Sequence, residues 1–284
     1  MSGALLRTDE LCVTFGGLRA VDSLDLEVHV GQLVGLIGPN GAGKTTTIDG
    51  LTGFVPTTGG VTFDGKRISG MPAHDRAKLG LGRTWQSLEL FDDLTIAENL
   101  MVAAETTSIK DVLLDIVIPG RKRNIGGALD SLDLLGIADL RDHYPNEISQ
   151  GQRKLVGVAR ALAASPKLVC MDEPAAGLDS RESLELGAQL RRVVDSGVPI
   201  LLVEHDMGLV TSVCDYLYVI EFGRKIAEGT PEVVMKDPHV IAAYLGTAAD
   251  DNGDGDGDVE TAVVGTTAFV EERFGATDAT TGDA

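Results

Sequence analysis

Residues 38–46 read Gly-Pro-Asn-Gly-Ala-Gly-Lys-Thr-Thr and contain the spacing G-x-x-x-x-G-K-[ST]. Glycines in such a loop let successive backbone N–H groups converge on phosphate oxygens, and the helix start that follows adds positive potential. Lys44 can reach the β and γ phosphates of a nucleoside triphosphate, and the Thr45 hydroxyl can ligate Mg²⁺. The predicted phosphate-binding residues are Gly38, Pro39, Asn40, Gly41, Ala42, Gly43, Lys44, Thr45 and Thr46.

Two acidic residues, Asp172 and Glu173, follow the run 167–171, which is apolar after Lys167. At the carboxyl end of a buried strand, Asp172 can hold Mg²⁺ through water. The adjacent Glu173 can polarise a water molecule for in-line attack on the γ-phosphate. The pair therefore predicts hydrolysis of the bound triphosphate, in addition to binding.

A third motif, Ile-Ser-Gln-Gly-Gln at 148–152, precedes a helical pattern over 154–164. This order places Ser149 at the N-cap of the helix, where its hydroxyl and the nearby N–H groups can bind an anion. The motif therefore predicts a second phosphate-binding surface without a second glycine-rich loop.

With these three motifs, residues 4–246 resemble the ATP-binding subunits of ABC transporters. The family signature reads L-S-G-G-Q, and here Ile148 and Gln150 replace the leucine and the first glycine. The order of the remaining motifs also fits the family. This sequence has segments that match the family's glutamine loop at 83–86, Walker B strand at 168–173, D-loop at 176–179 and switch histidine at 205.

The resemblance implies that two subunits pack head to tail, in a homodimer or a heterodimer, so that each ATP contacts both. It further implies that Glu173 is the general base, that His205 contacts the γ-phosphate, and that Asp172 binds the metal. Gln86 would ligate the metal and link the nucleotide state to the permease. The other residues implied to contact ATP or to act across the dimer are Phe15, which stacks on adenine, Ser149, Gly151, Gln152 and Asp179.

Several short sequence segments are similar to those of the ATPases of branched-chain amino acid uptake systems, particularly the larger of their two ATPases. They include Leu-Thr-Gly-Phe at 51–54 and Val-Ile-Ala-Ala-Tyr-Leu-Gly at 240–246. This resemblance implies permease partners, an indirect role for a solute-binding protein, and a place on the cytoplasmic face of the membrane. Import of urea, short amides or aromatic acids, export of lipopolysaccharide, a non-transport ATPase and a non-hydrolysing regulator stay open as alternatives.

An α/β fold must position these residues, with a P-loop NTPase core, an antiparallel β subdomain and a helical subdomain. The runs 33–37, 167–171 and 199–203 are apolar apart from Lys167 at the start of the second, and each is followed by polar residues. This pattern is typical of parallel strands buried on both faces. Turn signals at Gly16-Gly17 and Asp64-Gly65 predict antiparallel hairpins. Helical spacing is found over 94–104, 128–138, 154–164 and 182–194, and Thr230-Pro231 predicts a further helix start.

The 284 residues carry 24 Lys and Arg against 43 Asp and Glu, a net charge of −19. Such a chain is repelled by nucleic acid, which we therefore exclude as a partner. Residues 248–284 hold ten acidic residues and one basic residue, so this segment carries −9 and residues 1–247 carry −10. We expect an ATPase domain over 1–247, with its helical subdomain at about 87–165, and a disordered acidic tail over 248–284.

The three cysteines, Cys12, Cys170 and Cys214, form no C-x-x-C pair and have apolar neighbours. We expect buried thiols in a reducing compartment. The first ten residues lack a basic region followed by an apolar core, so no signal peptide is predicted.

Overall fold

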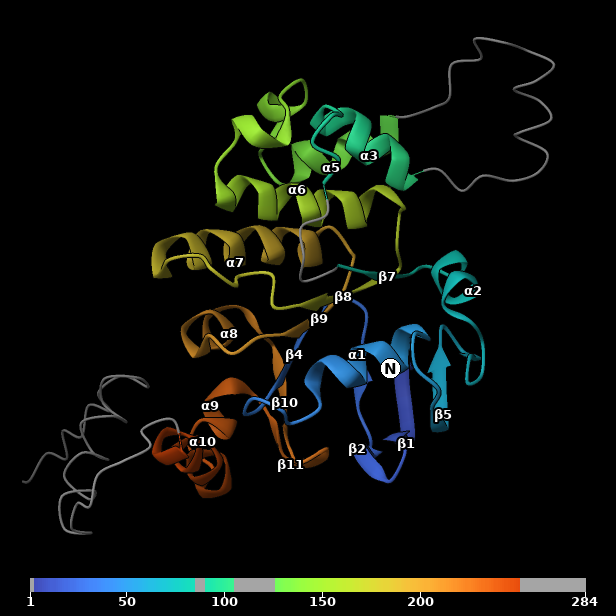
Figure 1. Cartoon of the computed structure of the whole chain (residues 1–284), viewed down its shortest axis with the longest axis vertical. Coiled ribbons are helices and arrows are strands. Elements are labelled where there is room, and N and C mark those ends of the chain that lie inside the picture. The colour runs from blue at the N-terminus through green and yellow to red at the C-terminus, as the bar shows by residue number, and fades with distance from the viewer. Residues whose placement is uncertain (1–2, 85–89, 105–125, 251–284) are drawn as a thin grey trace, which may run out of the picture.

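The computed structural model describes residues 3–84, 90–104 and 126–250, and it divides into two sheets and a separate layer of helices (Figure 1). Gln86 and most of the acidic segment 248–284 lie outside the described residues. Within the described residues, no helix is long and apolar enough to cross a lipid bilayer.

The larger sheet carries the predicted parallel strands, and its order is β11-β10-β4-β9-β8-β7. Strands β10, β4, β9, β8 and β7 are parallel, and only the edge strand β11 runs antiparallel to its neighbour. The three continuous apolar runs became central strands, as predicted. The strand bounds are β4 Leu33–Ile37, β7 Leu81–Arg83, β8 Leu168–Asp172, β9 Ile200–Val203, β10 Tyr216–Glu221 and β11 Arg224–Gly229.

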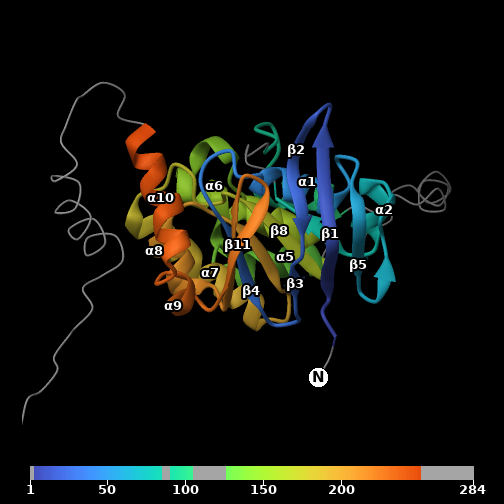
Figure 2. The same ribbon diagram turned by 90° about the horizontal axis from the view of Figure 1, so that it is seen from below.

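The smaller sheet is antiparallel, in the order β2-β1-β5-β6, with β3 also pairing with β1. Figure 2 shows β2, β1 and β5 side by side. Both predicted hairpins are confirmed, because Gly16-Gly17 joins β1 to β2 and Asp64-Gly65 joins β5 to β6. The strand bounds are β1 Leu6–Phe15, β2 Leu18–Leu24, β3 Glu27–Val28, β5 Thr58–Phe63 and β6 Lys66–Arg67.

Helices α3, α5 and α6 form a layer at one end of the molecule, and α7 lies between this layer and the larger sheet (Figure 1). The pattern over 128–138 extends too far, since α5 ends at Leu134 and Gly136 adopts a left-handed φ of 68° that stops the helix. The helix bounds are α1 Lys44–Thr52, α2 Ala73–Lys78, α3 Ile96–Ala104, α5 Gly126–Leu134, α6 Gln150–Ala163, α7 Ser180–Asp195, α8 Met207–Val213, α9 Pro231–Val234 and α10 Pro238–Asp250, with 3₁₀ turns at Ala138–Leu140 and Pro145–Glu147.

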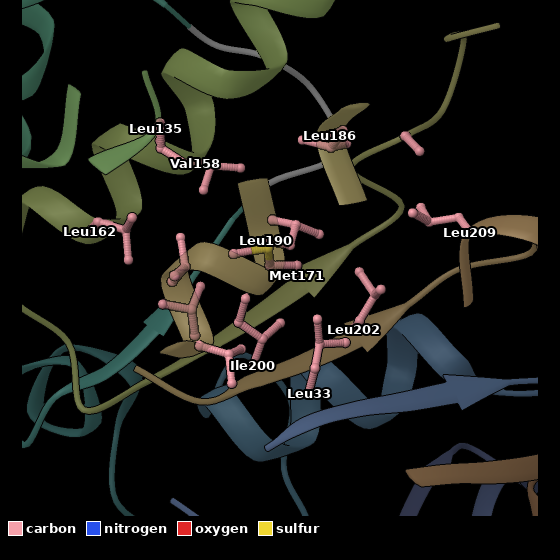
Figure 3. Close-up of a cluster of buried hydrophobic side chains, with 14 of the residues drawn as sticks. Leu33, Leu135, Val158, Leu162, Met171, Leu186, Leu190, Ile200, Leu202 and Leu209 are labelled. Carbon is pink, nitrogen blue, oxygen red and sulfur yellow. The ribbon is translucent and has the colours of Figure 1, made fainter. Parts of the chain in front are cut away.

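The larger sheet is buried on both faces. Leu33 and Ile37 of β4 pack into one apolar cluster, whereas Val34 and Leu36 point to the other. In the first cluster, side chains of β4, β8 and β9 meet those of α6 and α7 (Figure 3). Burial on both faces explains why these strands are apolar throughout instead of alternating. It also leaves only the strand ends free to carry polar chemistry.

The cysteine prediction is confirmed for Cys170 and Cys214, which are buried free thiols, but it is wrong for Cys12, which is only partly buried. Leu11 and Val13 take the core side of β1, so Cys12 points to the opposite face. Burial raises the pKa of both the Cys170 and the Cys214 thiol to about 12. Burial also raises the pKa of Tyr218 to about 12.

These raised pKa values predict a loss of stability in alkali. An unfolded thiol titrates near 9, so the unfolded chain releases protons first as pH rises, and the free energy of unfolding falls between about pH 9 and 12. Each buried thiol contributes a slope of up to about 1.4 kcal/mol per pH unit. Urea unfolding from pH 8 to 10.5 measures this slope, and Cys170→Ala should reduce it. A Cys170→Ala protein with the wild-type slope would contradict the prediction.

Candidate functional site

The glycine-rich loop joins β4 to α1 at the carboxyl edge of the larger sheet. Gly38 has a φ of 152°, and a Cβ there would collide with the carbonyl oxygen of Ile220 on β10. Gly43, the N-cap of α1, has a φ of 102°, and a Cβ there would collide with the carbonyl oxygen of Ala20 on β2. Both glycines are therefore required by backbone conformation and by close packing. The loop is held between the two sheets.

Lys44 is the first residue of α1, and its side chain folds back over the loop. Its Nζ donates hydrogen bonds to the carbonyl oxygens of Gly38, at 2.8 Å, and Pro39, at 2.9 Å. Burial lowers the pKa of Lys44, while the negative charges of Glu173 and Asp172 oppose that shift. The ammonium group thus lies within the loop and in the field of the two acidic residues.

Asp172 ends β8 and faces the start of α1. The Thr45 Oγ1 donates to Asp172 Oδ1 at 3.3 Å. Asp172 Oδ2 is buried and accepts no hydrogen bond from the described residues. Burial raises the pKa of this carboxyl group, and the hydrogen bond from Thr45 and the charge of Arg83 oppose the shift.

Arg83, at the end of β7, provides a charge contact that sequence reasoning missed. Its Nη2 lies 3.8 Å from Asp172 Oδ2, and its Nη1 lies 2.5 Å from Asp49 Oδ1 on α1. The guanidinium group also lies over the ring of Phe54, 5.3 Å from its centroid. This arginine connects the strand end of Asp172 to the helix that follows the glycine-rich loop.

Glu173 and His205 come from neighbouring strand ends and meet beside the loop. His205 Nδ1 lies 4.0 Å from Glu173 Oε1, and the imidazole is about half exposed. The Glu173 N–H donates to Val203 O at 2.9 Å, which fixes the residue to the end of β9. Its φ of 49° is left-handed, an unfavourable conformation for a residue with a long side chain. The structure thus brings the predicted base and the predicted γ-phosphate contact together.

Glu204, which directly precedes His205, was not predicted to have a role. It is fully buried, and it accepts hydrogen bonds from the N–H groups of Ala175, at 2.8 Å, and His205, at 3.2 Å. Burial raises its pKa, and these two hydrogen bonds oppose the shift. Its position after β9 in Glu-His-Asp was the only signal in the sequence. Glu204 therefore holds the segment that follows β8 and the segment that follows β9 at the same carboxylate.

The signature segment forms the start of α6. Ser149 is the N-cap, as predicted, and its Oγ accepts from Gln152 N at 3.2 Å while Gln152 Oε1 accepts from Ser149 N at 2.9 Å. This capping box forms although Gln150 replaces the family's glycine. The Gln150 side chain extends toward Gly177 of the D-loop segment. In the part of the chain that the structure describes, no hydrogen bond joins Ser149, Gly151 or Gln152 to the glycine-rich loop of the same chain.

Asp179 has a local structural role in this chain. It is the N-cap of α7, and its Oδ1 accepts from the N–H groups of Arg181, at 2.9 Å, and Glu182, at 2.8 Å. Phe15, at the end of β1, is half exposed. The described structure places both residues on the surface of the chain.

Comparison with known proteins agrees with this arrangement. Residues 21–176 match the family model described as ABC transporter, and residues 224–250 match one described as branched-chain amino acid ATP-binding cassette transporter. The chain is 38% identical over 255 residues to the high-affinity branched-chain amino acid transport ATP-binding protein BraF of Pseudomonas aeruginosa, which covers 87% of this chain and all of that protein. It is 36% identical over 244 residues to the lipopolysaccharide export system ATP-binding protein LptB of Escherichia coli. That match covers 86% of this chain and 98% of LptB.

A solved structure agrees as well. The ADP conformation of MJ1267, an ATP-binding cassette of an ABC transporter, superposes with a TM-score of 0.77 at 31% identity, covering 86% of this chain and all of that one. The chain therefore belongs to the ATP-binding proteins of ABC transporters, and it is an ATPase whose hydrolysis of ATP is coupled to transport. Within that family it is of the branched-chain amino acid type.

Proposed function

We propose that this chain is the ATP-hydrolysing subunit of an importer that takes up branched-chain amino acids. The observation that carries the proposal is the meeting of Lys44, Asp172, Glu173 and His205 at one sheet edge, in a chain whose C-terminal segment matches the branched-chain amino acid model. A second candidate is lipopolysaccharide export, which the 36% identity to the E. coli export ATPase supports. Import of urea, short amides or aromatic acids rests on family resemblance alone.

The residues present fit a magnesium ion beside the β and γ phosphates. Asp172 Oδ2 is a buried acceptor that no described residue satisfies, and Thr45 Oγ1 lies close to the other oxygen of the same carboxylate. Hard oxygen ligands with room for water suit Mg²⁺. Thr45 and Asp172 would hold the ion together with Gln86, which lies outside the described residues. When bound, Mg²⁺ would neutralise charge on the phosphates.

The chain's own residues would perform the remaining steps. When ATP binds, the Lys44 ammonium group leaves the carbonyl oxygens of Gly38 and Pro39 and donates hydrogen bonds to phosphate oxygens instead. The loop N–H groups and the start of α1 bind the remaining phosphate oxygens. Glu173 accepts a proton from the attacking water as the bond from the water oxygen to the γ-phosphorus forms. The bond from that phosphorus to the oxygen bridging the β and γ phosphates breaks, and ADP and inorganic phosphate leave. His205 contacts the γ-phosphate from the exposed side, and Glu204 holds its backbone.

A second ATPase subunit, packed head to tail, would complete each site. Among the described residues of a single chain, the signature segment makes no hydrogen bond to the glycine-rich loop, and Ser149 lies exposed at the start of α6. A partner's γ-phosphate would meet the Ser149 hydroxyl, the Gly151 N–H and Gln152, while Asp179 would lie at the dimer interface.

Ser149→Arg is expected to block this ATP-dependent dimerisation. The arginine would place bulk and charge where the partner's γ-phosphate binds, and it would also remove a capping hydrogen bond worth about 1 kcal/mol. Size-exclusion chromatography with light scattering measures dimerisation with ATP. Ser149→Ala controls for the lost cap, because it leaves the space open. If Ser149→Arg dimerises with ATP as well as the wild-type protein does, the head-to-tail arrangement is refuted.

The ATPase would act through integral membrane permeases, which place it on the cytoplasmic face of the membrane, and indirectly through a solute-binding protein. The proposed division is an ATPase domain over 1–247, with a helical subdomain at about 87–165 that receives the permease, and an acidic tail over 248–284.

Deletion of the gene followed by measurement of labelled leucine, isoleucine and valine uptake tests the proposed function. Uptake should fall and return with the wild-type gene but not with a Glu173→Gln copy. The substrate assignment would be wrong if uptake of all three amino acids is unchanged. Loss of urea uptake, of aromatic acid uptake or of outer-membrane lipopolysaccharide would then identify the transported solute. Co-purification with ribosomes and without a permease would contradict transport itself.

A further inference from the structure

Phe222 occupies an unusual place at the tip of the hairpin that joins β10 to β11. Its φ is 47° and that of Gly223 is 79°, so both residues of this two-residue turn are left-handed. Such turns favour glycine, asparagine and aspartate, and a bulky aromatic residue is disfavoured there. The side chain is also 85% exposed, the highest value among the large apolar residues of the described chain. Folding alone gives no reason for phenylalanine at this position.

The hairpin tip is fixed against the glycine-rich loop. Gly223 N donates to Ala42 O of that loop at 2.9 Å, and Gly223 O accepts from Asp22 N on β2 at 2.8 Å. The side chain of Arg224 forms an ion pair with Asp22 at 2.6 Å. These bonds connect the turn that carries Phe222 to the phosphate-binding loop and to β2. Phe222 therefore has a set position relative to any bound triphosphate.

The order of the strands fixes the direction in which a bound nucleotide extends. β4, which leads into the loop, lies between β9 on one side and β10 on the other. The groups that act on the γ-phosphate, Asp172, Glu173 and His205, all lie at or just beyond the carboxyl ends of β8 and β9. The nucleoside must therefore extend to the opposite side, toward β10. Because β10 is parallel to β4, its carboxyl end lies at the same sheet edge, and Phe222 directly follows that end.

We propose that Phe222 contacts the base or ribose of the bound nucleotide, as a second apolar surface beside that of Phe15. The proposal rests on the proposed function, because it assumes that the glycine-rich loop holds a nucleoside triphosphate. It explains why an exposed aromatic side chain is kept in an unfavourable backbone conformation. Phe15 and Phe222 come from separate hairpins that both flank the loop, so each can bind the nucleoside while the loop binds phosphate.

Phe222→Asn tests the proposal, since asparagine suits the turn and the variant should fold with an unchanged or raised Tm. Equilibrium titration should show the Kd for ATP raised about five- to tenfold, the size expected for losing one stacking aromatic. The Kd for inorganic tripolyphosphate, which has no base or ribose, should stay within twofold. Phe222→Trp should restore ATP binding. Leu184→Asn, which removes an exposed apolar side chain from α7, is the matched control.

Two results would overturn the inference: a Kd for ATP within twofold of wild type in Phe222→Asn, or an equal weakening of ATP and tripolyphosphate. If Phe222→Asn binds ATP normally but a Glu173→Gln background no longer dimerises, Phe222 contacts a second subunit and the inference is wrong. Failure of the wild-type protein to bind ATP would instead refute the proposed function.

Discussion

Replacing Glu173 with glutamine is expected to abolish ATP turnover and to leave ATP binding intact. Glutamine has the same shape but cannot accept the proton of the attacking water, so kcat should fall about 100-fold or more. The phosphate contacts of Lys44 and the loop N–H groups are unaffected, and the protein should accumulate as an ATP-bound dimer. Phosphate release measures turnover, and fluorescence titration with an ATP analogue measures binding.

The matched control is Glu185→Gln, an equal change of charge at an exposed position on α7. It should hydrolyse ATP at the wild-type rate. Turnover by Glu173→Gln within threefold of the wild-type rate would show that another group is the base. Loss of ATP binding in Glu173→Gln would show that the substitution disturbs the site as a whole.

The second large effect is expected for Lys44→Ala. Lysine is the only side chain of the loop that carries positive charge, and a hydrogen bond to a charged group contributes about 1.5–3 kcal/mol. The Kd for ATP should rise about 10- to 100-fold, and hydrolysis should fall with it. The folded state should persist, because the carbonyl oxygens of Gly38 and Pro39 can bind water once Nζ is removed.

Lys78→Ala removes an exposed lysine from α2 and serves as the comparison. Circular dichroism shows whether Lys44→Ala keeps its helices, and isothermal titration calorimetry gives the two Kd values. Wild-type affinity in Lys44→Ala would mean that the loop does not hold the triphosphate in the proposed way.

The sequence was most informative where burial leaves a continuous signal. β4, β8 and β9 are apolar throughout because both faces are covered, and their polar ends marked Asp172, Glu173 and His205. β7 gave no comparable signal. It is a three-residue edge strand that includes a glycine, and its place in the sheet depends on pairing with β8.

The missed residues act over long separations in the chain. Arg83 reaches Asp49 across 34 positions, and Glu204 accepts from Ala175 across 29. No periodicity or motif in the sequence indicates either contact, because each forms only when strands and helices pack together. Ser149 shows the reverse case: its motif was recognised, and its place as an N-cap followed from the helix pattern.

The left-handed backbone of Glu173 has a consequence for how this position evolves. A non-glycine residue in that conformation lowers stability by about 1–2 kcal/mol, a cost that asparagine or glycine would reduce. Neither of those residues could replace the carboxylate as a base. Selection for heat resistance alone, with no demand for ATP turnover, should therefore favour replacement of Glu173 early. The presence of glutamate at this position therefore indicates that selection for ATP hydrolysis outweighs selection for folding stability there.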